Sequence, residues 1–148
     1  MNLDQRPTKD ETYFALAEAW SRRATCPRAS VGCVIVDNNG HVLTSGYNGS
    51  PRGLPHCSEV GCLMSGNNCV RTVHAELNAI IQAARTGVSL VGGHLYVTHR
   101  PCVRCTQAII QAGIVSVKYK TSYGGDHAIA DDVALMFQQS GVEVERYT

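Results

Sequence analysis

Residues 73–80 are Val-His-Ala-Glu-Leu-Asn-Ala-Ile, and residues 101–105 are Pro-Cys-Val-Arg-Cys. The apolar residues of the first stretch recur at helical spacing, which predicts a helix over 74–85. The second stretch directly follows an apolar run at 94–98, which predicts a strand, and it begins a helix expected over 102–112. A strand that alternates with helices in this way is typical of a sheet covered by helices.

The elements outside these two stretches follow from capping and turn residues. Thr8 and Glu11 match a capping box at the start of a helix, and Asp37-Asn38-Asn39-Gly40 is turn chemistry between two extended runs. The expected elements are helices at 9–24 and 128–139, and strands at 31–36, 41–45, 114–119 and 142–146.

The order α-β-β-α-β-α-β-α-β predicts a single domain over residues 1–148. Its class is α/β, with three α/β/α layers and a five-stranded mixed sheet that carries helices on both faces. The segment between the last two strands is long enough for a crossover that returns the chain parallel. The first two strands alone are expected to pair antiparallel.

Charge and hydropathy exclude some classes of partner. The net charge is +1 and charged residues make up 17% of the chain, so no basic footprint for a long nucleic acid is present. No stretch approaches the roughly 18 apolar residues of a membrane span, and residues 1–11 are polar. We therefore expect no membrane partner and a cytoplasmic location, or the host cytoplasm for a viral protein.

The seven cysteines carry most of the chemical information. In a reducing compartment they predict metal binding or catalysis in preference to a disulfide framework. Cys33 lies inside the apolar run at 31–36, where a thiol behaves as a small buried hydrophobe.

His74, Cys102 and Cys105 lie at the beginnings of two predicted helices. Cys102 and Cys105 project from one helical face, where the helix dipole favours their thiolates. One imidazole and two thiolates suit tetrahedral zinc with a fourth position left for water. Glu76 is close enough to act as a proton carrier without binding the metal. Taken separately, a lone histidine is more often structural, and a lone C-x-x-C could be a redox motif or part of a closed zinc knuckle.

The combination of H-x-E with P-C-x-x-C is the signature of zinc nucleobase deaminases. With the stretch Gly46-Tyr47-Asn48-Gly49-Ser50-Pro51-Arg52-Gly53, nearly the whole chain resembles the cytidine and deoxycytidylate deaminase superfamily, most closely its deoxycytidylate (dCMP) deaminases. The resemblance implies the cytidine deaminase-like fold and a homohexamer.

The resemblance also implies regulation, in which dCTP activates and dTTP inhibits at an effector site that could include Mg²⁺ with the triphosphate. Glycine-rich backbone can approach phosphates closely, although the same stretch could be only a structural turn. The expected effector-binding residues are Gly46, Tyr47, Gly49, Pro51, Arg52 and Gly53.

A second, structural zinc site is expected from Cys57, Cys62 and Cys69, with Cys26 as the fourth ligand. Four thiolates would make a closed tetrahedral site. Some similar deaminases carry a second zinc here and others lack it. The alternative is a set of free thiols, and His56 is the reserve ligand.

The substrate expected from the resemblance is dCMP, whose phosphate needs donors. Arg28 occupies the position of a phosphate-binding arginine in similar enzymes, and Tyr123 matches a tyrosine near the phosphate. Asn48 can bond the sugar 3′-hydroxyl, and the backbone N–H of Ala75 can bond the 2-carbonyl of the base. The alternatives are a surface arginine, a turn-forming asparagine and a surface aromatic.

The expected reaction is hydrolytic deamination, in which dCMP and water give dUMP and ammonia. Glu76 carries the protons, and dUMP would supply thymidylate synthesis. The rivals are deamination of tRNA adenosine, free cytidine or dCTP, and a zinc-stabilised nucleotide-binding module without activity. The charge balance near zero argues against a tRNA substrate.

Overall fold

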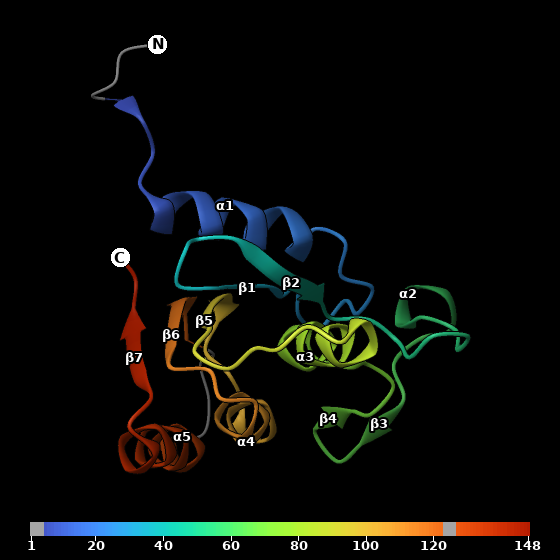
Figure 1. Ribbon diagram of the computed structural model, residues 1–148. Coiled ribbons are helices and arrows are strands. Elements are labelled where there is room, and N and C mark those ends of the chain that lie inside the picture. Colours follow the sequence, from blue (N-terminus) through green and yellow to red (C-terminus); the bar gives the residue numbers. More distant parts are fainter. Residues whose placement is uncertain (1–4, 123–126) are drawn as a thin grey trace.

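The computed structural model describes residues 5–122 and 127–148, and Figure 1 shows their arrangement. A five-stranded sheet in the order β2-β1-β5-β6-β7 forms the centre, and β3 and β4 form a separate small hairpin. The helices are α1 (Lys9–Ser21), α2 (Cys57–Val60), α3 (Ala75–Thr86), α4 (Val103–Gln111) and α5 (His127–Ser140). The strands are β1 (Gly32–Val36), β2 (Val42–Tyr47), β3 (Met64–Ser65), β4 (Asn68–Cys69), β5 (His94–His99), β6 (Ser116–Thr121) and β7 (Glu143–Arg146).

Helix α1 begins at the predicted capping box. The Glu11 backbone N–H donates to Thr8 Oγ1 at 3.1 Å, and the Thr8 N–H donates to Glu11 Oε2 at 2.7 Å. The two bonds satisfy donors that the first turn leaves unpaired. The helix ends at Ser21, three residues earlier than predicted.

The sheet corrects one prediction, because antiparallel pairing is not restricted to the first two strands. β1 pairs antiparallel with β2 and also with β5, whereas β5–β6 and β6–β7 are parallel. The helix α3 carries the chain from β2 to β5, which run in the same direction with β1 between them. The crossover therefore skips one strand, which a local sequence pattern does not encode.

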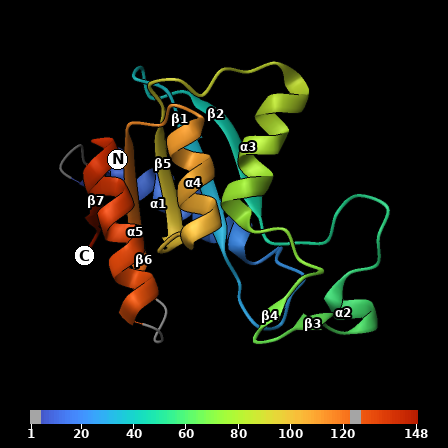
Figure 2. The same ribbon diagram turned by 90° about the horizontal axis from the view of Figure 1, so that it is seen from below.

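Helices cover both faces of the sheet, as predicted (Figure 2). On one face α1 packs Tyr13, Phe14 and Ala17 against Val34 and Tyr96. On the other face α3, α4 and α5 enclose a larger apolar core, built from buried side chains of these helices and of three strands. That core includes Cys33, Ile35, Ala79, Leu95, Val97, Ile109, Val117 and Phe137.

Cys33 confirms its interpretation as a buried hydrophobe. Its side chain is fully inaccessible to solvent, and desolvation raises the pKa of the thiol well above its ordinary value. The neighbouring strand residues alternate between the two faces, which places Cys33 and Ile35 on the side of α3.

Two glycines allow helices to approach the sheet closely. A Cβ at Gly32 would lie 1.8 Å from the Ala17 carbonyl oxygen, and a Cβ at Gly46 would lie 2.4 Å from the Ala75 carbonyl oxygen. The second contact presses the beginning of α3 against β2, so the residues around His74 have a fixed position relative to the sheet.

The segment between β2 and α3 contains α2 and the β3–β4 hairpin, neither of which the sequence predicted. Both lie apart from the five-stranded sheet (Figure 2), and residues 49–73 contribute no side chain to the two apolar cores of the described chain. Among the described residues, no helix combines the length and apolar character that a membrane span requires.

Candidate metal-dependent active site

The beginnings of α3 and α4 bring together His74, Cys102 and Cys105. His74 is the N-cap of α3 and Cys102 is the N-cap of α4. The His74 Nδ1 lies 3.4 Å from Cys102 Sγ and 3.5 Å from Cys105 Sγ. A nitrogen and a sulfur bound to one tetrahedral zinc ion are separated by about 3.6 Å. The three side chains therefore fit a single zinc ion.

Electrostatics in this cluster favour metal binding. A hydrogen bond from the Cys105 thiol, together with His74, lowers the pKa of Cys102 to about 4. The hydrogen bond to Cys102 and burial raise the pKa of Cys105, because two neighbouring thiolates repel each other without a cation between them. The site thus holds one thiolate readily, and a divalent cation would stabilise the second.

Glu76 lies in the first turn of α3 beside the Cys105 thiol. Only 4% of this residue is exposed, and desolvation raises the pKa of its carboxyl group to about 7. A carboxyl group with this pKa can both accept and donate a proton near neutral pH. This burial and pKa suit a proton carrier, and that role of Glu76 stays a prediction.

Backbone pairing and side-chain hydrogen bonds connect the end of β2 to the N-terminus of α3. Gly49 forms an isolated antiparallel bridge with Val73, and the Asn78 side chain donates to the carbonyl oxygens of Tyr47 and Val73 at 2.8 and 3.2 Å. Asn78 had no role in the sequence analysis, because nothing in its local pattern shows which carbonyl groups it reaches.

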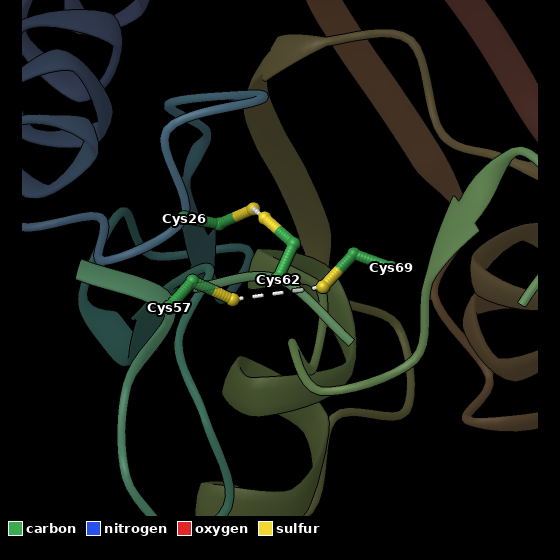
Figure 3. Close-up of side chains that lie close together, drawn as sticks. All are labelled: Cys26, Cys57, Cys62 and Cys69. Atoms are coloured by element: carbon green, nitrogen blue, oxygen red, sulfur yellow. Dashed lines mark hydrogen bonds between the residues drawn. The ribbon is translucent and has the colours of Figure 1, made fainter. Parts of the chain in front are cut away.

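Cys26, Cys57, Cys62 and Cys69 form a second cluster, with their sulfurs turned toward one another (Figure 3). Cys26 Sγ lies 3.9 Å from Cys62 Sγ, and Cys57 Sγ lies 3.5 Å from Cys69 Sγ. Four sulfurs on one tetrahedral zinc ion lie about 3.8 Å apart. The cluster therefore has the dimensions of a closed zinc site.

Hydrogen bonds around the second cluster distinguish Cys69 from His56 as a candidate ligand. Desolvation raises the pKa of Cys69, but backbone hydrogen bonds from Arg71 and Leu63 outweigh it and lower this pKa to about 6. His56, the reserve ligand, is not in the cluster. Its Nδ1 bonds instead to Thr25 Oγ1 at 3.0 Å.

The predicted substrate-binding residues have different surroundings. Arg28 is exposed and contacts the β3–β4 hairpin. Asn48 is only 4% exposed. Its Oδ1 accepts from the Val31 N–H and its Nδ2 donates to the Ala29 carbonyl oxygen, so half of its hydrogen-bonding capacity is already used. Ala75 is buried at the first position of α3, and Tyr123 lies outside the described residues.

The six predicted effector-binding residues do not share one surface. Gly46 and Tyr47 belong to β2, and the Tyr47 ring stacks on Trp20 with centroids 5.5 Å apart. Gly49 is buried, whereas the last three members are exposed. These last three are Pro51, Arg52 and Gly53.

A mixed sheet that holds a His–Cys–Cys cluster and a buried glutamate at two helix N-termini defines the class of zinc-type nucleobase deaminases. The profile of the "Cytidine and deoxycytidylate deaminase zinc-binding region" matches residues 7–121. The chain therefore belongs to the cytidine and deoxycytidylate deaminase family, as the sequence analysis predicted.

Individual relatives agree with this assignment. The chain is 43% identical to "ComE operon protein 2" of Bacillus subtilis over 142 residues, which cover 96% of this chain and 72% of the relative. It is 36% identical to the deoxycytidylate deaminase of Schizosaccharomyces pombe, with 96% of this chain but only 45% of the yeast enzyme covered. The dCMP deaminase of the cyanophage S-TIM5, solved in complex with dCMP and dUMP, superimposes with a TM-score of 0.81 at 35% identity and covers 97% of this chain and 99% of its own.

Proposed function

We propose that this chain catalyses the hydrolytic deamination of dCMP to dUMP and ammonia. The observation that carries the proposal is the cluster of His74, Cys102 and Cys105 with Glu76 buried beside it, in a fold that matches a dCMP deaminase over nearly its whole length. The product would supply thymidylate synthesis.

In this proposal His74, Cys102 and Cys105 hold the catalytic zinc. Zinc bound there supplies Lewis-acid chemistry for the attack of water at C4 of the base. Glu76 accepts the proton of the attacking water, delivers it to N3 and then protonates the departing amine. Its burial fits this task, because it raises the pKa of the carboxyl group to about 7, so that the group can both accept and donate a proton near neutral pH.

The substrate is oriented by groups that surround this cluster. The backbone N–H of Ala75, which the first turn of α3 leaves without a helical acceptor, donates to the 2-carbonyl of the base. Arg28 and Tyr123 bind the phosphate. Asn48 contributes its remaining amide hydrogen to the sugar 3′-hydroxyl.

The second cluster is proposed to hold a structural zinc ion. Its support is the set of four sulfurs whose spacing matches a tetrahedral site, in a segment that lacks an apolar core of its own. Such a site would supply folding free energy to the segment without contacting the substrate. The ligands are Cys26, Cys57, Cys62 and Cys69.

The proposed activity also includes regulation by nucleoside triphosphates. It comprises activation by dCTP and inhibition by dTTP, with Mg²⁺ accompanying the triphosphate, in a homohexamer. Its support is the exposed loop at 51–53, where Arg52 adds positive charge. A substrate curve that is sigmoidal alone and hyperbolic with dCTP would agree with it, whereas hyperbolic kinetics that ignore both triphosphates would reject it.

One assay tests the activity itself. Ammonia release is measured in parallel from dCMP, dCTP, cytidine, deoxycytidine and a tRNA anticodon stem, with the Glu76→Gln variant as the control for contaminating enzymes. We expect release from dCMP at the highest kcat/KM, and release from the variant lower by a factor of at least about 10². Preference for any other substrate, or no release at all, would reject the proposal.

A further inference from the structure

Arg28, the proposed phosphate-binding residue, contacts the β3–β4 hairpin in the segment between β2 and α3. Its Nη2 donates to the Asn67 carbonyl oxygen at 3.0 Å, and its Nη1 lies 3.7 Å from Met64 Sδ. Both partners belong to the β3–β4 hairpin, which turns at Gly66 and Asn67. The hairpin therefore holds the exposed Arg28 side chain in one orientation, although Asn67 is 39 residues away from Arg28 in the sequence.

Hydrogen bonds also connect the backbone that follows Arg28 to the beginning of α3, where His74 lies. Asn48 accepts a hydrogen bond of 2.8 Å from the backbone N–H three residues after Arg28. The next residue, Gly49, pairs with Val73, which directly precedes the zinc-ligand candidate His74. The segment that carries Arg28 thus lies between the hairpin and the beginning of α3.

We infer that the β3–β4 hairpin is a positioning element for phosphate recognition, with Met64 and Asn67 holding the Arg28 guanidinium in place for the phosphate of dCMP. This inference rests on the proposed function. A guanidinium has five N–H donors, and the hairpin uses two of them. The others keep the fork geometry that suits two phosphate oxygens.

The expected effect is on substrate binding. A free surface arginine loses rotamer freedom when it binds a phosphate, whereas an arginine already held by the hairpin has lost it beforehand. The phosphate is remote from the reacting C4 atom. Loosening the hairpin should therefore raise KM and leave kcat unchanged.

The variant Gly66→Val loosens the turn without a steric clash. Gly66 has φ of +60°, and a Cβ there meets nothing within 4 Å, so a β-branched residue acts through backbone strain alone. Gly141→Val is the matched control, because Gly141 has φ of +78° and equally open surroundings after α5.

For Gly66→Val we expect KM for dCMP to rise about five- to tenfold, equivalent to the loss of about one ordinary hydrogen bond, with kcat and zinc content unchanged. Gly141→Val should leave all three unchanged. In the Arg28→Ala background, Gly66→Val should add nothing, because the group it positions is gone. Additive effects, an unchanged or lower KM, or a fall in kcat alone would overturn the inference.

Two further measurements keep the test decisive. If Gly66→Val loses zinc, the variant Met64→Leu tests the inference in its place, because it keeps the turn and the side-chain volume but removes the sulfur. For Met64→Leu we expect KM to rise about twofold. An unchanged KM would overturn the inference. Calorimetric binding of dUMP should weaken by the same factors as KM rises. That binding measurement separates the two claims, because a chain without turnover would reject the proposed activity, while weaker dUMP binding in the variants would still support the hairpin's role.

Discussion

The double variant Cys62→Ala, Cys69→Ala tests whether a metal ion folds the segment between β2 and α3. The thirteen residues from Cys57 to Cys69 contain one helical turn and a hairpin with two residues in each strand. Ordering them costs on the order of 13 kcal/mol at about 1 kcal/mol per residue. Apolar cores do not repay this cost, because none of their described members comes from the segment. A structural zinc site contributes roughly 10–16 kcal/mol, which is a comparable amount.

The expected result is local unfolding. Zinc content, measured by mass spectrometry of the native protein, should fall from two equivalents to one. Hydrogen exchange should show lost protection at Gly61 and Val70, whose N–H groups bond to the Cys57 and Leu63 carbonyl oxygens, with rates raised at least about a hundredfold. The amides of β1 and β5 should keep their protection.

Cys33→Ala is the matched control, because it also removes a thiol but from the core beneath α3. It should keep two zinc equivalents and the protection of residues 57–70, while lowering global stability by about 1 kcal/mol. The reasoning is refuted if the double variant keeps two equivalents, or if it loses one and residues 57–70 remain protected.

Three other perturbations test the active site, the charge network and the packing. Glu76→Gln should lower kcat by a factor of about 10² to 10⁴ with zinc content unchanged, and normal turnover would contradict its role as proton carrier. Desolvation raises the pKa of Asp10, but the hydrogen bonds from Lys118 and Tyr96 outweigh it and hold this pKa below 3.8. Asp10 therefore stabilises the fold above its ordinary pKa and loses this effect as pH falls through the folded-state pKa. In urea unfolding, Asp10→Asn should cost roughly 1 kcal/mol at pH 7, and the difference from the unmodified chain should shrink below about pH 4; a difference that is independent of pH would count against the network. Gly32→Ala should cost about 3 kcal/mol in the same assay, because the new Cβ would lie 1.8 Å from the Ala17 carbonyl oxygen; a cost within about 0.5 kcal/mol would show that α1 can shift freely.

Elements with strong local signals could be predicted from the sequence. The capping box at Thr8 and the apolar periodicity after His74 gave the beginnings of α1 and α3 to within a residue. The residues of the first cluster could be grouped because H-x-E combined with P-C-x-x-C is the signature of zinc nucleobase deaminases, whereas the spacing of Cys57, Cys62 and Cys69 left free thiols as an alternative. The structure brings each group together.

Features that depend on distant contacts could not be predicted. The pairing of β1 with β5 joins strands separated by the whole of α3, and strand periodicity does not identify the partner strand. The β3–β4 hairpin is too short for a periodic signal. Only the folded chain shows that Asn67 and Met64 contact Arg28, or that the Asn48 amide already makes two hydrogen bonds to the backbone.

The ligands of the two clusters differ in how far apart they lie along the chain, so we expect them to come together at different stages of folding. Cys57, Cys62 and Cys69 are close neighbours in the chain, whereas Cys26 is 36 residues from Cys62 and His74 is 28 residues from Cys102. Thiols that are close in sequence can capture a metal ion before the sheet forms, but the distant ligands arrive only after slower, long-range contacts. We therefore expect a partial three-thiol site to bind metal early in folding, whereas each complete site forms only after the long-range contacts that bring Cys26 to Cys62 and His74 to Cys102.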